Sequence, residues 1–184
     1  GHLAPVSRPS RPSGPPDRGF GHAGYPAIGR TRAAAEAFCV WLEARTGLQA
    51  RLPTPEEWTF LASADQADTP APEHDLSETA WFNANTDDTT QPVGRRSPNA
   101  FGLHDTLGNV AEWVMTDTGK PIAMGGSFRD AGEGCTPRST QRQRSSWNTS
   151  DPQIPKSRWW LADCGWVGFR FVVEMDDKGD ADDD

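Results

Sequence analysis

From Asp75 onward, this chain has no long stretch in which apolar residues recur with helical spacing. Its apolar runs are short and separated by glycine, proline, asparagine and aspartate. We expect short strands there, at residues 81–82, 92–94, 101–103, 110–115, 122–128 and 166–173. Only the last is long, with apolar residues at alternate positions from Val167 to Val173. We therefore expect tryptophan packing and turn chemistry to hold the fold together, with a bound metal as a further contributor.

A first helix is predicted between Thr31 and Gly47. Thr31 is a suitable N-cap, and glycine is typical of the position just after a helix. Residues spaced three and four apart form one apolar stripe that includes Phe38 and Trp41. Cys39 lies beside this stripe, where a small buried thiol needs no chemical role.

A second helix is predicted to begin at Pro55. Thr54 can cap it, and proline suits the first helical position. Glu57 stands three residues after the cap, where its carboxylate can accept a hydrogen bond from the N–H of Thr54. The helix carries Trp58 on its inner face and ends near Ala64.

Length and charge exclude several classes of protein. The 184 residues suffice for one hydrophobic core. Of the net charge of −8, residues 174–184 contribute −6, from seven acids and one lysine, so the rest of the chain carries −2. Because nucleic-acid binding needs a concentrated basic surface, we expect no nucleic-acid partner. No apolar run is long enough for a membrane span, and no signal peptide is recognised in this chain.

The composition divides the chain into three regions. Residues 1–30 are rich in proline and glycine and are interpreted as an extended arm. We expect residues 31–173 to form the folded domain and residues 174–184 to be an acidic, disordered tail. Three cysteines without a CxxC motif predict neither a disulfide framework nor a cysteine-rich zinc site.

Five short motifs occur in a fixed order. They are Ala35-x-x-Phe38-Cys39-x-Trp41-Leu42, Arg51-Leu52-Pro53-Thr54-x-x-Glu57-Trp58, Asn99-x-Phe101-Gly102-Leu103-x-Asp105-x-x-Gly108-Asn109-Val110-x-Glu112-Trp113, Gly125-Gly126-Ser127-Phe128 and Gly168-Phe169-Arg170. Together they resemble the formylglycine-generating enzyme family, also called sulfatase-modifying factors, from about residue 20 to Val173.

The resemblance implies an α+β fold of the C-type-lectin-like class, with two helices, a small antiparallel sheet and much irregular structure. Members of the family carry further strands before the helix that contains Phe38. The resemblance therefore implies that an upstream segment or a protein partner completes the domain. It also favours an extracytoplasmic location, in the periplasm or outside the cell.

Some family members use copper and dioxygen to convert a sulfatase cysteine to formylglycine. In those members two cysteines follow the Gly-Gly-Ser turn, and a soft thiolate pair suits Cu(I). Counted from Ser127, Asp130 stands here at the first cysteine position and Cys135 at the second. A carboxylate with one thiolate is a poor Cu(I) site, so we expect no copper. Cys135 and Ser127 would be catalytic only in an active member.

The role of Cys135 stays open between three alternatives. It is a partly exposed free thiol, or it pairs with Cys164. In the third alternative, Asp130 or Cys164 completes an unusual metal site around it. That last alternative predicts an oxygen-dependent oxidase that forms formylglycine, or a related metal-dependent oxygenase.

The resemblance also implies a structural calcium ion. Its ligands would be a side-chain oxygen of Asp105, the main-chain carbonyls of Gly108 and Val110, and the carboxylate of Glu112. Calcium prefers such hard oxygen donors, and Gly108 allows a sharp chain path. In the alternative, Glu112 pairs with an arginine and water fills the loop.

A tryptophan-rich segment near the end of the chain is a candidate ligand surface. Tryptophan and arginine are enriched at binding hot spots, and in the family this segment lines the ligand face. The candidate residues are Trp147, Trp159, Trp160 and Arg142. The alternative is that these tryptophans pack a fold with little regular structure.

These observations favour a repurposed, non-catalytic domain of the family. It would act as a binding or assembly module, or as a subunit of a larger complex, with bound calcium. Its partners would be a protein or the upstream segment, and a peptide or a small ligand.

Overall fold

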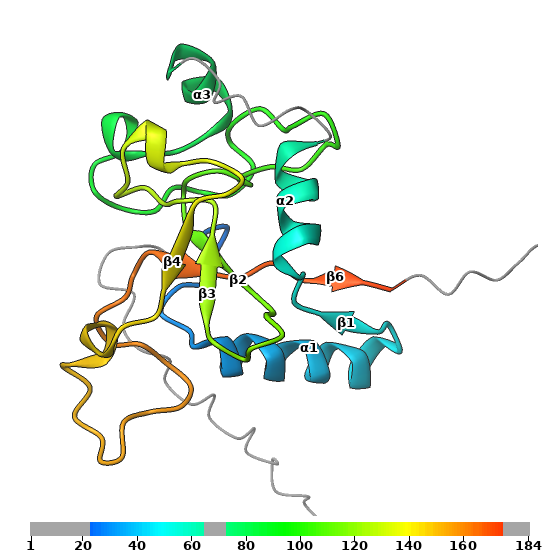
Figure 1. Ribbon diagram of the computed structural model, residues 1–184, viewed down its shortest axis with the longest axis vertical. Coiled ribbons are helices and arrows are strands. Elements are labelled where there is room, and N and C mark those ends of the chain that lie inside the picture. The colour runs from blue at the N-terminus through cyan, green and yellow to red at the C-terminus, as the bar shows by residue number, and fades with distance from the viewer. Residues whose placement is uncertain (1–22, 65–72, 175–184) are drawn as a thin grey trace, which may run out of the picture.

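The structure, a computed structural model, describes residues 23–64 and 73–174 of the 184. Within these residues it contains three α-helices, six short strands and three 3₁₀ turns (Figure 1). They follow in the order α1 (Arg32–Thr46), β1 (Ala50–Arg51), α2 (Pro55–Ser63), α3 (Glu73–Thr79), η1 (Asn83–Asn85), β2 (Ala111–Val114), β3 (Ile122–Met124), η2 (Gly132–Gly134), β4 (Thr140–Arg142), η3 (Ser145–Asn148), β5 (Val167–Gly168) and β6 (Val172–Val173).

No helix within the described residues has the length and apolar character needed to cross a lipid bilayer.

Both predicted helix starts are confirmed. The Thr31 hydroxyl accepts a hydrogen bond from the N–H of Ala34, and Gly47 ends α1 with a φ of 75°. At α2, the Thr54 hydroxyl accepts from the N–H of Glu57 at 3.2 Å, and the Glu57 carboxylate accepts from the N–H of Thr54 at 2.9 Å. These reciprocal bonds satisfy two N–H groups that the helix leaves unpaired.

The buried side of α1 differs from the predicted stripe. Ala35 and Cys39 are buried, as expected for Cys39, whereas Phe38 is 36% exposed and Trp41 is 56% exposed. Residues four apart lie on one line of a helix, so a line of two small side chains lets α1 pack closely on the core. The two aromatic side chains then lie beside the contact and face outward.

The central sheet has the order β4-β3-β2-β5. Strand β2 pairs antiparallel with β3, and β3 pairs antiparallel with β4. Strand β5 pairs parallel with β2, so the expected purely antiparallel sheet is wrong on one side. Figure 1 shows α1 crossing below the strands, with α2 beside them.

The long strand predicted at residues 166–173 is divided between two sheets. β5 pairs with β2, whereas β6 pairs antiparallel with β1. Alternating apolar residues indicate extended backbone, but they do not specify its partner. The partner changes after Gly168, and residues 169–171 connect the two sheets.

The segment that follows Asp75 is more helical than predicted. Helix α3 and three 3₁₀ turns lie in a region where only short strands were expected. The predicted strands at residues 92–94 and 101–103 are turns, and Trp81 forms a single bridge with Gly108. In and just after α3, the buried apolar side chains are Leu76 and Ala80, so no periodic apolar pattern marks this short helix.

A buried carboxylate joins α2 to the sheet and to the β5–β6 connection. Glu112 lies in β2, and its Oε2 accepts hydrogen bonds from the indole N–H of Trp58 at 3.0 Å and from Nε of Arg170 at 2.7 Å. Its Oε1 accepts a bond from Nη2 of Arg170 at 3.0 Å. The same Nη2 donates to the carbonyl of His104 at 2.9 Å. One ion pair thus connects four segments of the chain.

We expect Arg170→Met to lower the free energy of unfolding by about 3 kcal/mol, because it leaves the Glu112 charge buried without its partner. Chemical denaturation measures this loss. A double variant with Glu112→Gln is expected to recover part of it, since the buried charge is then absent and the indole of Trp58 keeps an acceptor. A loss below about 1 kcal/mol in the single variant would contradict a structural role for the pair.

A second ion pair generates a pH prediction. The two guanidinium N–H groups of Arg51 lie 2.6 and 2.7 Å from the Glu57 carboxylate, and its Nε lies 2.8 Å from Glu174. Hydrogen bonding from Arg51, followed by that from the Thr54 N–H, lowers the pKa of Glu57 to about 2. In the unfolded chain the pKa of a glutamate is about 4.3. The stabilisation is therefore present above pH 4.3 and is lost as the pH falls through about 2.

We expect the unfolding free energy of the wild-type chain to fall more steeply between pH 5 and pH 2 than that of Glu57→Gln. Glutamine keeps the cap acceptor but has no titrating charge. The effect is modest, because the Glu57 side chain is 40% exposed. Denaturation curves at several pH values provide the measurement, and equal slopes for the two proteins would refute the assignment.

Candidate functional site

Two glycines bring the predicted catalytic residues together. Gly125 and Gly126 have φ values of 97° and 73°, and a Cβ on Gly126 would lie 2.9 Å from the sulfur of Cys135. This close approach places Cys135 against the turn, where its thiol donates to the carbonyl of Ser127 at 3.7 Å.

Asp130 is the centre of a polar network. Its Oδ2 accepts hydrogen bonds from the Ser127 hydroxyl at 2.7 Å and from the Gln141 amide at 2.9 Å. The Gln141 carbonyl oxygen accepts from the indole N–H of Trp166 at 3.0 Å. Ser127 is fully buried, so its hydroxyl is held within the fold. The network fastens the loop after the turn to β4 and to the segment before β5.

Cys135 is poorly placed for thiol chemistry. It is 2% exposed, so the expectation of a partly exposed thiol is wrong. Burial, and next the negative charge of Asp130, raise the pKa of Cys135 to about 12. Because the thiolate is the nucleophile, a thiol that is protonated at neutral pH is a weak nucleophile in the metal-free chain.

The three cysteines are free thiols, so the alternative of a Cys135–Cys164 disulfide is wrong. The two residues belong to different clusters of the core. Cys135 packs with Leu76 and Phe82, whereas Cys164 packs in the cluster around Trp113. Burial also raises the pKa of Cys164 to about 12.

The predicted calcium ligands lie on one loop and the strand that follows it. Gly108 has a φ of 68°, and a Cβ there would lie 2.1 Å from the carbonyl oxygen of Trp81, so the position requires glycine. Asp105 has a φ of 53° and accepts a hydrogen bond from the N–H of Gly94 at 2.7 Å. Val110 is buried immediately before β2.

This donor set fits calcium in part. Oδ1 of Asp105 is buried and has no hydrogen-bond partner among the described residues, which leaves one hard oxygen for a cation. Glu112, by contrast, is neutralised by Arg170. Within residues 23–64 and 73–174, no group of three or more His, Cys, Asp or Glu side chains is arranged to hold a metal ion. Calcium binding by Asp105, Gly108, Val110 and Glu112 stays a prediction.

The four predicted ligand residues lie in different environments. Trp147 is buried, and its ring packs 6.0 Å from Trp113 and 5.5 Å from Trp166, which agrees with the packing alternative. Trp160 is partly buried and forms a backbone bridge with Arg30. Trp159 is 43% exposed.

Arg142, the fourth of these residues, is exposed on strand β4, at the edge of the sheet. Of the four, Trp159 is the one that lines the pocket described next.

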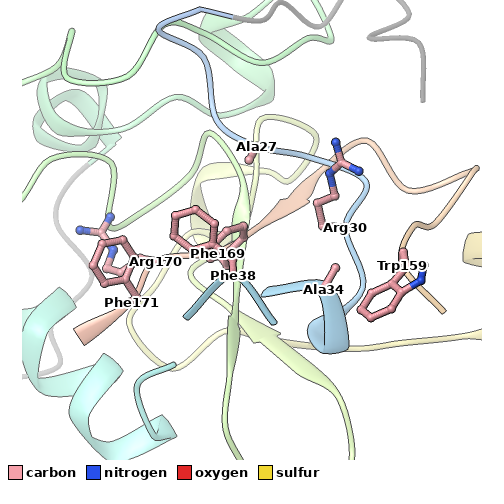
Figure 2. Close-up of a pocket in the computed structure, with 8 residues that line it drawn as sticks. All are labelled: Ala27, Arg30, Ala34, Phe38, Trp159, Phe169, Arg170 and Phe171. Carbon is pink, nitrogen blue, oxygen red and sulfur yellow. The ribbon is translucent and has the colours of Figure 1, made fainter. Parts of the chain in front are cut away.

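A largely apolar pocket of about 690 Å³ lies beside the start of α1 (Figure 2). Its lining residues are Ala27, Arg30, Ala34, Phe38, Trp159, Phe169, Arg170 and Phe171. The sequence pattern places Phe38 on a helix stripe and Phe169 and Phe171 on a strand, so it does not reveal the surface that the three side chains share. The only sequence signal for the pocket was the aromatic residues in two motifs, the one that contains Phe38 and the one that contains Phe169. Whether these motifs meet in the fold depends on where the chain leaves β5.

Two curated relatives match about half of this chain. Serine/threonine-protein kinase pkn1 of Chlamydia pneumoniae is 36% identical over 95 residues, which are 52% of this chain and 14% of the kinase. The formylglycine-generating enzyme of Mycobacterium tuberculosis is 33% identical over 109 residues, which are 52% of this chain and 34% of the enzyme. The chain thus spans at most about a third of either relative.

Solved structures share the fold. PvdO from Pseudomonas aeruginosa superposes with a TM-score of 0.65 and 23% identity, over 83% of this chain and 63% of PvdO. CarF superposes with a TM-score of 0.60 and 22% identity, over 88% of this chain and 72% of CarF. The expected α+β fold of the C-type-lectin-like class is confirmed, with three helices instead of two.

The family model described as the sulfatase-modifying factor enzyme 1-like domain matches residues 7–175. The match covers nearly the whole chain and includes the Gly-Gly-Ser turn, the Glu112 loop and the Gly-Phe-Arg motif. The chain therefore belongs to the formylglycine-generating enzyme family, also known as the sulfatase-modifying factors.

Proposed function

We propose that this protein is a non-catalytic member of the family that acts as a binding or assembly module. The proposal rests chiefly on Asp130, which the family resemblance places at a copper-cysteine position and which accepts hydrogen bonds from Ser127 and Gln141. A carboxylate already engaged by two donors lacks the soft, free sulfur that Cu(I) needs. The burial of Cys135, which is 2% exposed and therefore closed to a peptide substrate, supports the same conclusion.

The outer face of α1 supports a protein partner for this module. Val40, Trp41 and Leu48 are exposed large apolar residues on α1 and just after it. Burial of such side chains against another polypeptide is favourable, at roughly 25 cal/mol for each Å² of apolar surface. We propose that a protein partner or an upstream segment covers this face.

The alternative, an oxygen-dependent oxidase, draws on the proximity of Ser127, Asp130 and Cys135. A copper experiment separates the two functions. We expect the wild-type chain neither to retain Cu(I) against a chromophoric chelator nor to convert the cysteine of a sulfatase-motif peptide to an aldehyde, followed by mass spectrometry. Asp130→Cys adds the missing thiolate and is expected to raise Cu(I) affinity at least about tenfold.

Glu133→Cys is the matched control, because it adds a thiol at an exposed position of the same loop and should leave Cu(I) affinity unchanged. Circular dichroism establishes that each variant is folded. Stoichiometric copper and peptide turnover in the wild-type chain would overturn the proposal. The copper content and peptide turnover of the wild-type chain distinguish the two functions even if Asp130→Cys does not fold.

We also propose a structural calcium ion at the Asp105 loop, supported by the unpartnered Oδ1 of Asp105. Calcium at 100 times its Kd would stabilise the fold by about 2.7 kcal/mol. We therefore expect the Tm to rise by about 5 °C relative to EDTA, measured by differential scanning calorimetry. Asp105→Asn should reduce the rise, whereas the exposed control Asp117→Asn should not. Equal Tm values with calcium and EDTA would mean that the Glu112–Arg170 pair stabilises the loop without a cation.

A further inference from the structure

We propose that the pocket beside α1 binds a small molecule with an apolar body and one anionic group, such as an aryl or alkyl carboxylate. The pocket volume of about 690 Å³ lies within the range of small-molecule sites, roughly 300–1,000 Å³. This inference goes beyond the proposed function, because Cys135 and the exposed Val40, Trp41 and Leu48 are not among the residues that line the pocket.

The aromatic walls select the apolar body of the ligand. The ring of Phe38 lies 5.4 Å from that of Phe169 and 5.9 Å from that of Phe171. In Figure 2 these three rings gather at one end of the pocket, and Trp159 lies toward the other end, beyond Ala34. Phe38, Phe171 and Trp159 are all partly exposed, so a ligand seated between them removes their apolar surface from water.

The charges around the pocket select the anionic group. None of the eight lining residues is acidic, and two are arginines. Arg170 has its charge balanced by the two oxygens of Glu112. The Arg30 guanidinium, in contrast, makes no hydrogen bond or ion pair with another residue in the described part of the chain. The pocket therefore has one uncompensated cation at its border, with a planar donor group that suits a carboxylate.

The backbone holds Arg30 in place before any ligand binds. Its carbonyl accepts a hydrogen bond from the indole N–H of the buried Trp113 at 2.8 Å. The preceding Gly29 donates to the carbonyl of Val167 and accepts from the N–H of Leu161. A preformed site loses less conformational freedom on binding, which favours affinity for a small ligand.

The test uses two probes of nearly equal shape, 4-phenylbutanoate and 4-phenylbutanol, titrated into the full chain by isothermal titration calorimetry. We expect the carboxylate to bind at least about tenfold more tightly than the alcohol, because the carboxylate can form a bidentate ion pair with Arg30 and the alcohol can accept only a single hydrogen bond from it. Arg30→Gln should reduce this ratio to about threefold or less. Arg95→Gln, an equal change of charge at an exposed arginine away from the pocket, should leave the ratio unchanged.

A second variant tests the location without a change of charge. Ala34→Leu keeps a strong helix former in α1 and fills the pocket, so it should weaken both probes at least about fivefold while the far-ultraviolet circular dichroism stays the same. Unchanged binding in this variant would place the ligand elsewhere and overturn the proposal.

Two other results would also overturn it. Equal affinity of the wild-type chain for 4-phenylbutanoate and 4-phenylbutanol would show that Arg30 does not recognise the carboxylate. No binding of either probe would mean that this surface is a contact for polypeptide and not a ligand site. The copper experiment is independent of these titrations, so a catalytic chain that binds 4-phenylbutanoate would refute the proposed function and leave the pocket assignment intact.

Discussion

The ion pair between Glu112 and Arg170 is the contact on which the arrangement of this domain depends. A carboxylate in the middle of β2 is costly to bury unless its oxygens are paired, and here Arg170 and the indole of Trp58 satisfy them. Because Arg170 lies between β5 and β6, this requirement fixes where the chain leaves the central sheet. The positions of Phe169 and Phe171, on either side of Arg170, follow from it.

Packing around Trp113 supports this polar centre. Trp113 is fully buried in β2, next to Glu112, and contacts the ring of Trp147. Its indole N–H bonds to the carbonyl of Arg30, so the same strand that holds the ion pair also holds the chain entering α1. Short strands of two to four residues are marginal alone, and large aromatic side chains supply the burial that longer strands would provide.

Local signals in the sequence were sufficient to predict where the first two helices begin and end and to recognise the family. Thr31, Gly47, Thr54 and Glu57 specify caps through bonds to neighbouring backbone, which depend on nothing distant. The family resemblance singled out Ser127, Asp130 and Cys135, and the structure places all three in contact. The predictions that were wrong concerned contacts between segments far apart in the sequence, which local signals do not specify.

Three such failures have physical causes. The alternation at residues 166–173 could not reveal that two strands pair in different sheets. The stripe on α1 could not show that the core contacts a line of small residues, leaving Phe38 and Trp41 outside. The pocket was missed for the same reason, because its walls come from α1, from the β5–β6 connection and from the segment around Trp159.

The burial of all three cysteines affects how readily the folded chain is oxidised. Peroxide oxidation and mixed-disulfide formation both begin with an accessible thiolate. Cys39, Cys135 and Cys164 are buried, and burial raises the pKa of each thiol. In the folded chain the three thiols are therefore shielded from oxidants and from thiol–disulfide exchange, and they become accessible to both when the domain opens.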